Sequence, residues 1–550
     1  MFGMMQNRPL LISAIIEHAA LNHATTEIVS KAIDGSVHRT TYAAIEPRMR
    51  RLARALQRLG VGEGDRVATL AWNGFRHLEL YYAAPGMGAV YHTINPRLAL
   101  TDIAFIIEDA QDGVLCAEAC FADLVTALAP SIPSVKHIVI MADAADMPDI
   151  QIAAGMTLHC YEDLVAAADE DFAWPLLDER MASGLCYTSG TTGRPKGVLY
   201  SHRSTVLHAY AMNSADVFGL RAVDRVLPVV PMFHVNAWGV PFSGPMAGAT
   251  LVMPGRHLDG PSLTALMNAE QVTISAGVPT VWLGLLQHLR ASGERLATVQ
   301  RLVIGGSTCP PMLIDAFARE YDIRVDHAWG MTETSPLGTY NRPKAGEAVL
   351  DPVALARRRL KQGRPMFGLE MQIVGDDMQT LPRDGVTFGN LSVRGHWVCD
   401  RYYGAVAQGG TNADGWFATG DVATIDADGF MDITDRSKDV IKSGGEWISS
   451  ITLENIAVAH PDVAEAAIIA AQHPKWDERP LLLVVAKPGR TIDTAALLGG
   501  YAGHVPKWWL PDAILAVEAL PHTATGKINK LALRALYGEH FMEIPAPAAK

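Results

Sequence analysis

The sequence is poor in charged residues and in cysteine, and it has no long uncharged hydrophobic run. Charged residues make up 19% of the 550 residues, below the ~25% of ordinary soluble domains. Apolar residues make up 49%, which excludes an intrinsically disordered chain. The six cysteines are scattered without a CxxC pair, so they indicate neither a disulfide scaffold nor a zinc or redox site. We expect buried, reduced thiols in a cytoplasmic protein.

The sequence also lacks a positive net charge, a long apolar run and a signal peptide, and these absences restrict the partners and the location that we expect for the protein. The net charge of −12 argues against a nucleic-acid partner. No apolar run approaches the ~20 residues that a transmembrane helix needs. The N-terminal apolar run Leu10–Ile16 is short and is followed directly by Glu17 and His18, unlike a signal peptide. We therefore expect no transmembrane segment and a cytoplasmic location.

Strand-like runs alternate with amphipathic helical stretches through the first two-thirds of the chain. A helical stripe follows Tyr42, and we expect Pro47 to place the first turn of this helix late. The stripe consists of Ile45, Met49, Leu52, Leu56 and Leu59. The alternation predicts an α/β fold of parallel sheets with helices on both faces. A chain of this length has room for two to four domains.

The pattern of predicted strands and helices changes twice in the last third of the chain. After about Tyr340, short strands between Gly/Asp turns predict a small β subdomain. Beyond Asp435 the pattern predicts a compact α+β unit with helices over 449–459 and 494–504, strands over 463–471 and 481–486, and a terminal helix. We place a domain boundary at Asp435–Lys438. The prediction is a large N-terminal domain, residues 1–435, hinged to a small C-terminal domain, residues 436–550.

The strongest local motif is the segment Tyr187–Val198, which follows the apolar stretch GLCY. Its glycines allow close approach of the backbone, its hydroxyls can donate to oxygens, and Lys196 adds a point charge, a combination that binds polyphosphate. It is not a Walker loop, because Pro195 and Gly197 flank the lysine. The alternative is a plain surface turn. The candidate nucleotide-binding residues are Thr188, Ser189, Gly190, Thr191, Thr192, Gly193 and Lys196.

The segment TSGTTGRPKGV resembles the signature of adenylate-forming enzymes, a family of acyl-CoA synthetases, carrier-loading adenylation domains and luciferases. Six further segments follow in family order, so the resemblance covers nearly the whole chain. They are PMFHVNAW, GGSTCPP, WGMTETSP, GWFATGD, DRSKDVIKSGGEWIS and LPHTATGKINK. The texture is nearest to the fatty-acyl-CoA synthetase branch, and the N-terminal segments resemble methylmercaptopropionate-CoA ligases as well as medium-chain ligases.

The resemblance implies two half-reactions that use ATP, Mg²⁺ and CoA. A carboxylate attacks the α-phosphate of ATP to give an acyl-adenylate and pyrophosphate, and the CoA thiol then displaces AMP. Glu333 resembles the magnesium carboxylate of the family, with Thr188 as a second metal contact. Read alone, Glu333 could instead be an acid in the first turn of a helix.

The resemblance assigns further residues to the nucleotide. Trp329 takes the place of an aromatic residue beside adenine, and Asp421 that of the acid that accepts both ribose hydroxyls. Alone, Trp329 could be a core side chain and Asp421 part of an ordinary turn. The remaining residues implied at this site are Gly305, Gly306, Ser307, Gly330, Met331, Thr332, Arg436, Lys438, Lys442, Trp447 and Lys527.

Lys527 resembles the mobile catalytic lysine of adenylation, which would bridge carboxylate and α-phosphate oxygens. Arg436 resembles the partner arginine near the ribose and phosphate, and Lys438 takes the hinge position. The resemblance implies that the C-terminal domain closes for adenylation. It then swings to present the Lys442–Trp447 face for thioester formation. Without the motifs, these residues would be read as a solvated linker and an exposed lysine.

An acyl pocket is implied around His234, which resembles a residue near the substrate carboxylate. Trp238 resembles an indole that gates the acyl tunnel in fatty-acid members. An isolated histidine or tryptophan would more often be core packing. No charged residue occurs in 232–242, which favours apolar acids over dicarboxylates. The acyl and CoA residues implied are His234, Val235, Trp238, Gly277 and Gly444.

The function predicted is that of an AMP-forming acyl-CoA ligase for a medium- or long-chain fatty acid. The alternatives are 3-methylmercaptopropionate or another short acid as substrate, and acyl transfer to a separate carrier protein. A nucleotide-binding regulator without activity and a luciferase-like oxygenase stay open as other classes. Fatty-acid members of this branch are commonly homodimers, so the resemblance implies a homodimer here.

Overall fold

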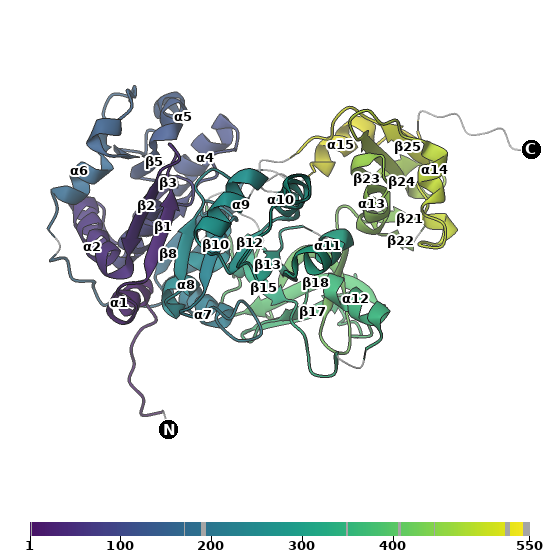
Figure 1. Cartoon of the computed structure of the whole chain (residues 1–550), viewed down its shortest axis with the longest axis horizontal. Helices are drawn as coiled ribbons and strands as arrows, with labels where there is room; N and C mark the ends of the chain where they lie inside the picture. Colours follow the sequence, from purple (N-terminus) through teal and green to yellow (C-terminus); the bar gives the residue numbers. More distant parts are fainter. Residues whose placement is uncertain are drawn as a thin grey trace, which may run out of the picture. The chain divides into compact units, whose positions relative to one another are not determined.

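We describe a computed structural model of the chain (Figure 1). It describes residues 1, 3–169, 171–188, 194–307, 309–347, 350–404, 409–444, 446–522 and 528–542. By internal contacts the chain divides into two compact units. Unit 1 comprises residues 1–370 and 393–417, and unit 2 comprises residues 371–392 and 418–550. This division by contacts does not test the domain boundary at Asp435–Lys438, which stays a prediction.

Unit 1 contains a seven-stranded sheet of order β7-β6-β5-β3-β4-β8-β9. Its neighbours are parallel except for the antiparallel pair β8–β9. The strands are β3 (Arg66–Leu70), β4 (Val90–Thr93), β5 (Val114–Glu118), β6 (His137–Met141), β7 (Thr157–Cys160), β8 (Ala182–Thr188) and β9 (Lys196–Ser201). The predicted parallel sheet is confirmed here.

A nine-stranded sheet completes unit 1, in the order β16-β15-β14-β13-β12-β10-β11-β1-β2. The run from β14 to β1 is parallel. The strands are β1 (Glu27–Lys31), β2 (Val37–Thr41), β10 (Arg225–Pro228), β11 (Thr250–Met253), β12 (Ile274–Gly277), β13 (Arg301–Ile304), β14 (Arg324–Gly330), β15 (Leu337–Tyr340) and β16 (Arg364–Pro365).

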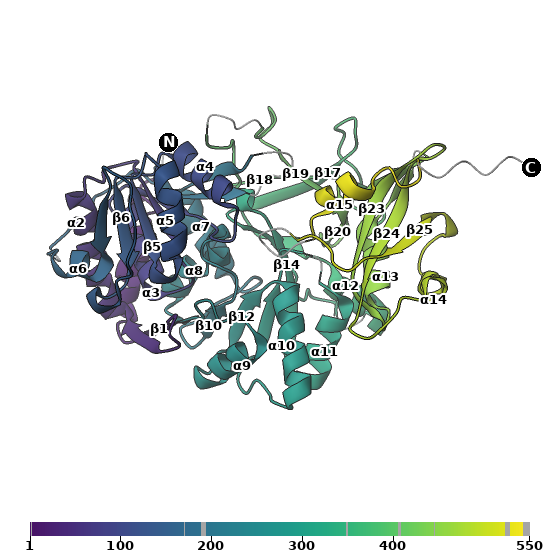
Figure 2. The same cartoon turned by 90° about the horizontal axis from the view of Figure 1, so that it is seen from above.

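Helices cover both sheets through apolar stripes. In Figure 2, α4 and α5 lie beside β5 and β6, and their buried side chains form one core with β3, β5 and β6. Figure 2 shows α9, α10 and α11 side by side, and they form a second core with β10, β11 and β13. The helices of unit 1 are α1 (Ile12–Asn22), α2 (Tyr42–Arg58), α3 (Phe75–Gly86), α4 (Leu100–Ala110), α5 (Ala122–Leu128), α6 (Tyr161–Ala166), α7 (His202–Met212), α8 (Val240–Ala247), α9 (Gly260–Ala269), α10 (Pro279–Ser292), α11 (Pro311–Tyr321) and α12 (Pro352–Leu360).

The helix α2 confirms the predicted stripe but corrects its start. It begins at Tyr42, five residues before Pro47, because the Thr41 side chain caps it by accepting the Ala44 N–H. Pro47 lies inside the helix, where it lacks only the one N–H that would bond to the preceding turn. The expectation that Pro47 delays the first turn is therefore wrong.

Unit 2 takes part in a four-stranded sheet and contains a five-stranded one. The first has the order β17 (Leu369–Val374), β18 (Phe388–Gly395), β19 (Phe417–Ile425) and β20 (Met431–Arg436), and it confirms the predicted β subdomain. The second has the order β22-β21-β24-β23, with β25 beside β24. Its strands are β21 (Ile441–Ser443), β22 (Glu446–Ile448), β23 (Val463–His473), β24 (Asp477–Ala486) and β25 (Ala513–Ala516).

The five-stranded sheet of unit 2 is covered on both faces. Alternate residues of β23 pack with α13 (Ser450–Val458) and α14 (Thr494–Gly499) on one side, and with α15 (Lys530–Tyr537) on the other. This period of two is what a sheet buried on both faces requires. The predicted α+β unit is thereby confirmed, with the second helix ending five residues early.

All six cysteines are free, and four of them are buried, whereas Cys120 is exposed and Cys399 is half-buried. Within the described part of the chain, no helix combines the length and hydrophobicity needed to cross a bilayer.

Candidate active site

Four adjacent parallel strands of unit 1 end at one edge of the nine-stranded sheet. In the order β14, β13, β12 and β10, they lead into the predicted segments at Trp329, Gly305, Gly277 and His234. The carboxyl ends of parallel strands are the usual ligand-binding edge of such sheets. The fold therefore brings the predicted adenine and acyl residues of unit 1 to one edge, although up to 95 residues separate them in sequence.

Glycines at this edge allow indole rings to approach the backbone. A methyl group at Gly305 would lie 2.9 Å from the Trp238 ring, and one at Gly338 would lie 2.5 Å from the Trp329 ring. Both indoles are buried, so each is held against a bare stretch of backbone. Gly277 packs in the same way against Trp282, a core side chain of α10. Its assignment to the pocket wall stays a prediction.

The predicted acyl segment forms a left-handed turn, η4 (Val235–Gly239). The φ angles of Val235, Asn236, Ala237 and Trp238 are 48°, 54°, 46° and 55°. Left-handed backbone costs roughly 1–2 kcal/mol for each residue that carries a Cβ. The turn directly follows His234, which is half-buried, and ends at the buried Trp238. Such strain persists only where surrounding contacts impose it, and it concentrates at functional sites.

The predicted phosphate loop joins the antiparallel strands β8 and β9. Thr188 and Lys196 stand opposite each other where this hairpin opens. The residues between them that we predict to bind phosphate, Ser189, Gly190, Thr191, Thr192 and Gly193, lie outside the described residues. The two described ends thus fix where the loop leaves the sheet and returns to it.

Tyr402 joins the phosphate-loop lysine to the predicted metal carboxylate. Its hydroxyl donates to Glu333 Oε1 over 2.7 Å, and its ring centroid lies 4.8 Å from Lys196 Nζ. Burial, followed by the Glu333 carboxylate, raises the pKa of the Tyr402 phenol well above its usual value. Glu333 is itself buried, next to Thr332, whose carbonyl accepts from Tyr200 over 2.8 Å. Lys196, Tyr402 and Glu333 therefore form one connected group.

The same turn carries the other predicted residues after β14. The backbone of Pro336 packs closely against Gly330. A methyl group at Gly330 would lie 2.1 Å from the Pro336 carbonyl oxygen, so only glycine allows this approach. The Met331 N–H donates to that oxygen over 3.0 Å. At the end of β13, Gly306 and Ser307 are exposed. These contacts hold the segment Gly330–Glu333 in one conformation.

Unit 2 holds a second group of predicted nucleotide residues. Asp421 on β19 stands opposite Arg436 on β20, and Arg436 Nε donates to Asp421 Oδ1 over 2.6 Å. The Asp421 side chain is 2% exposed and that of Arg436 is 40% exposed. At the predicted hinge, burial lowers the pKa of Lys438; Asp439 opposes this shift, and the nearby cations, Arg436 first, add to it.

The predicted thioester-forming face lies on β21 and β22 of unit 2. Lys442 and Trp447 are cross-strand partners, with Nζ 5.4 Å from the indole centroid. Gly444 has a φ of 59°, and a methyl group there would lie 2.9 Å from Trp476. The predicted catalytic residue Lys527 lies outside the described residues.

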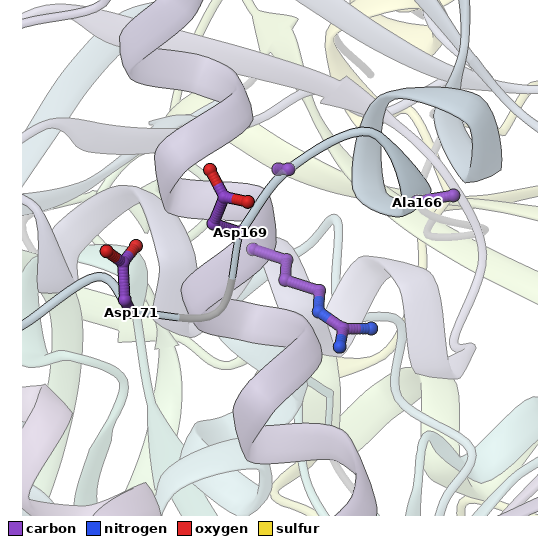
Figure 3. A pocket seen from close by; sticks show the side chains of 5 residues that line it. Ala166, Asp169 and Asp171 are labelled. Carbon is purple, nitrogen blue, oxygen red and sulfur yellow. The ribbon is translucent and has the colours of Figure 1, made fainter.

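A pocket elsewhere on unit 1 is distinct from this site. It is lined by Arg51 of α2, by the last residue of α6 and by residues that follow this helix; Figure 3 labels Ala166, Asp169 and Asp171 there. Two of its lining acids pair with arginines of α2, Asp169 with Arg58 over 2.9 Å and Asp171 with Arg54 over 3.5 Å. Because none of the predicted site residues lines it, we read it as an ion-paired surface. Its lining residues are Arg51, Ala166, Ala168, Asp169 and Asp171.

Comparison with known protein families shows which family the chain belongs to. The model of a family described as AMP-binding enzymes matches residues 16–403, and that of the AMP-binding enzyme C-terminal domain matches residues 452–527. The chain belongs to the AMP-binding enzymes. The two matches confirm the family predicted from the seven motifs.

This AMP-binding enzyme has curated relatives along its whole length. It is 53% identical to a 3-methylmercaptopropionyl-CoA ligase of Ruegeria lacuscaerulensis, over 97% of this chain and 98% of the relative. It is 49% identical to a medium-chain-fatty-acid–CoA ligase of Ectopseudomonas oleovorans, over 98% of each chain. The crystal structure of the anthranilate CoA ligase AuaEII with anthranoyl-AMP matches the fold with a TM-score of 0.83 at 24% identity. This match covers 96% of this chain and 98% of that one.

Two features of the AMP-binding enzyme were missed by sequence reasoning. Tyr402 lies 69 residues from Glu333, and no motif marks it as a site residue. The left-handed turn was also missed, because a β-branched Val235 argues against that backbone. Asn236 and Gly239 tolerate positive φ, and they are the one local signal that could have suggested it.

Proposed function

We propose that this AMP-binding enzyme is an acyl-CoA ligase that activates a medium- or long-chain fatty acid, whose chain carries no charge beyond the carboxylate. The acid carboxylate attacks the α-phosphate of ATP and releases pyrophosphate, and the CoA thiol then displaces AMP from the acyl-adenylate. The observation that carries the proposal is the connected group Lys196–Tyr402–Glu333 at the open end of the phosphate-loop hairpin. The CoA ligases among its relatives support the same reaction.

The residues of unit 1 suit a magnesium nucleotide. Among the residues that the structure describes, no three His, Cys, Asp or Glu side chains cluster as a protein-only metal site would need. Mg²⁺ usually takes one or two carboxylates and completes its shell with phosphate oxygens and water. Glu333 would supply the carboxylate, and Thr188 would supply a hydroxyl. When bound, the ion neutralises phosphate charge, while Lys196 adds a second positive charge.

The other predicted residues divide the remaining tasks. Trp329 and Gly305 would form the two walls around adenine, and Asp421 would accept both ribose hydroxyls, as two carboxylate oxygens can. Arg436, paired with Asp421, would lie near the ribose and phosphate. Lys527 would bridge the carboxylate and the α-phosphate during adenylation. The hinge at Lys438 would then exchange Lys527 for the Lys442–Trp447 face, where Gly444 admits CoA.

The acid is proposed to enter beside His234, with Val235 and Trp238 as apolar walls and Gly277 behind them. No charged residue occurs in 232–242, so nothing in that segment pairs with a second substrate charge. A second candidate substrate is 3-methylmercaptopropionate, which is favoured by the names of two relatives at 53% and 52% identity. One methylene changes binding by only ~1–3 kcal/mol, so the two acids differ by pocket depth rather than by chemistry.

The test is AMP release with ATP, Mg²⁺ and CoA across butyrate, 3-(methylthio)propionate, octanoate, laurate and palmitate, with a control lacking CoA. A CoA-dependent optimum at octanoate or longer acids supports the fatty-acid proposal. An optimum at 3-(methylthio)propionate selects the second candidate. AMP release that is indifferent to CoA contradicts the ligase and favours a carrier protein as acceptor. A cytoplasmic location and a homodimer are part of the proposal, and sedimentation of the purified chain tests the dimer.

A further inference from the structure

The left-handed turn η4 is anchored by side chains from distant elements. Asn236, 4% exposed, accepts through Oδ1 from the Tyr81 hydroxyl over 3.1 Å and from the Cys186 thiol over 3.4 Å. The single hydrogen of the Tyr81 hydroxyl is shared between Asn236 Oδ1 and the nearer Met232 carbonyl oxygen, which lies 2.5 Å from the hydroxyl. Thr93 Oγ1 lies 3.1 Å from Cys186 Sγ. The amide of Asn236 is thus held by α3 and by β8 of the seven-stranded sheet, whereas the strand before the turn, β10, belongs to the nine-stranded sheet.

The chain that enters the turn is held as firmly. Asn73, which follows β3, donates through Nδ2 to the carbonyls of Pro228 and Val230 over 2.9 and 3.0 Å. Its Oδ1 accepts the Met232 N–H over 2.7 Å. Together these bonds fix the approach to His234. The turn itself then depends on Asn236, the residue among its four non-glycines that best tolerates left-handed backbone.

The position of Trp238 depends on this anchor. The indole lies against Gly305, and a left-handed turn determines where its Cα stands. If the turn relaxed toward ordinary backbone, the peptide planes would rotate and the indole would leave Gly305. Strained backbone reverts unless side chains outside it oppose the change. Asn236 is the turn residue whose side chain connects it to the seven-stranded sheet and α3.

We propose that Asn236 is a positioning residue for the acid site, which holds the left-handed turn through Tyr81 and Cys186 and so sets which acids fit beside Trp238. The inference rests on the proposed function. It adds a specificity determinant that does not touch the acid. Cys186 belongs to β8, which ends at Thr188, so the same amide also ties the acid site to the strand that carries the phosphate loop.

The test begins with Tyr81→Phe, which removes the hydroxyl from α3 and leaves the turn's own residues unchanged. The ring stack of Tyr81 on Tyr91, 4.4 Å between centroids, should survive. We expect the ratio of kcat/KM for octanoate to that for 3-(methylthio)propionate to change by at least ~5-fold, while the KM for ATP stays within about twofold. A ratio unchanged from the wild-type protein overturns the proposal.

The variant Asn236→Gly distinguishes the contribution of the side-chain amide from that of the backbone conformation. Glycine keeps the left-handed conformation accessible but lacks the acceptor, so we expect the same change in ratio as for Tyr81→Phe. The double variant should change the ratio by less than the product of the single changes, because the bond between Tyr81 and Asn236 is lost in both, although Tyr81→Phe also loses the bond to Met232 and Asn236→Gly the one from Cys186. A wild-type ratio in Asn236→Gly would show that backbone freedom alone matters, and would overturn the role of the amide.

The matched control is Tyr82→Phe. Tyr82 is fully buried like Tyr81, and its hydroxyl donates to the Pro241 carbonyl in α8 over 2.7 Å. Tyr82→Phe should lower Tm without changing the ratio of the two kcat/KM values. If it changes this ratio as much as Tyr81→Phe does, the effect comes from general packing and not from the contact with Asn236. If the wild-type protein shows no CoA-dependent AMP release, the proposed function fails. The anchor is then judged by thermal unfolding, where additive Tm losses for Tyr81→Phe and Asn236→Gly overturn it and non-additive losses support it.

Discussion

Tyr402 donates its phenolic hydrogen to Glu333 Oε1 over 2.7 Å. This bond engages one of the two carboxylate oxygens and restricts the rotation of the carboxylate. Partners that orient a metal-binding carboxylate commonly matter nearly as much as the ligand itself.

Tyr402→Phe should therefore raise the Mg²⁺ concentration needed for half-maximal AMP release by ~10-fold. The ring and its contact with Lys196 would be kept, so the KM for the acid should change little. The control is Tyr403→Phe, because the Tyr403 hydroxyl lies 3.5 Å from the Ala110 carbonyl. An unchanged Mg²⁺ requirement would contradict the metal role of Glu333.

Gly338→Ala should displace the Trp329 indole, because the new methyl group would lie 2.5 Å from the ring. Aromatic stacking is worth roughly 0.5–1.5 kcal/mol, so the KM for ATP should rise by up to ~10-fold. The control is Gly284→Ala in α10, where a methyl group meets nothing within 4 Å. It should leave the KM unchanged and add ~0.5–1 kcal/mol of stability.

Asp421→Asn should raise the KM for ATP by ~10–100-fold, since a hydrogen bond to a charged group is worth ~1.5–3 kcal/mol. The amide keeps the side chain's size but loses one acceptor and the charge that pairs with Arg436. As a comparison, Glu370→Gln breaks an exposed pair with Arg394 of 2.8 Å and should have no effect. Equal ATP affinity in wild-type protein and Asp421→Asn would remove this residue from the ribose site.

Lys527→Ala should lower ATP–pyrophosphate exchange by ~100-fold or more, as the loss of a charge-stabilising group does. Thioester formation from supplied acyl-adenylate should be spared. The surface variant Lys487→Ala serves as the comparison and should retain both half-reactions. If Lys527→Ala slows both to the same extent, the account of two alternating conformations is wrong.

His208 makes the protein sensitive to acid. Burial lowers the pKa of its imidazole to about 3, and its Nε2 accepts the Leu337 N–H over 3.1 Å. The folded state therefore keeps it neutral, while the unfolded chain binds a proton below pH ~6.5. The stabilisation is complete above pH ~6.5 and is lost as the pH falls toward 3, by ~2 kcal/mol between pH 7 and pH 5.

His208→Gln can still accept that hydrogen bond but does not titrate. The fall in unfolding free energy from pH 7 to pH 5, measured in urea, should shrink by ~2 kcal/mol. Burial also lowers the pKa of His77, His202 and His327 to about 4, so part of the acid sensitivity should persist. An identical pH dependence in wild-type protein and variant would contradict the assignment.

Local signals were sufficient for elements and motifs. The stripe from Ile45 to Leu56 predicted α2, and the apolar run over 463–471 predicted the strand β23. The predicted start of α2 was wrong, because the cap that Thr41 provides outweighs the one hydrogen bond lost at Pro47. Propensity alone does not weigh these two effects against each other.

Arrangement in space could not be read from the sequence. The order β14-β13-β12-β10 places Trp329, Gly305 and His234 at one edge, and that order depends on long-range pairing. The bond from Tyr402 to Glu333 likewise joins segments that no periodicity connects. The left-handed turn runs against local preference and is held by Tyr81 and Cys186, which lie 155 and 50 residues from Asn236.

The division into two units has a consequence for recombination between relatives. Asp421 and Arg436 face each other across β19 and β20, and residues 371–392 belong to the same unit. A chimaera joined at residue 436 would take one member of this ion pair from each parent and splice the end of β20. Exchanges that move 371–392 together with 418–550 keep the unit's contacts within one lineage. Such two-segment chimaeras should fold and bind nucleotide better than those made with a single junction.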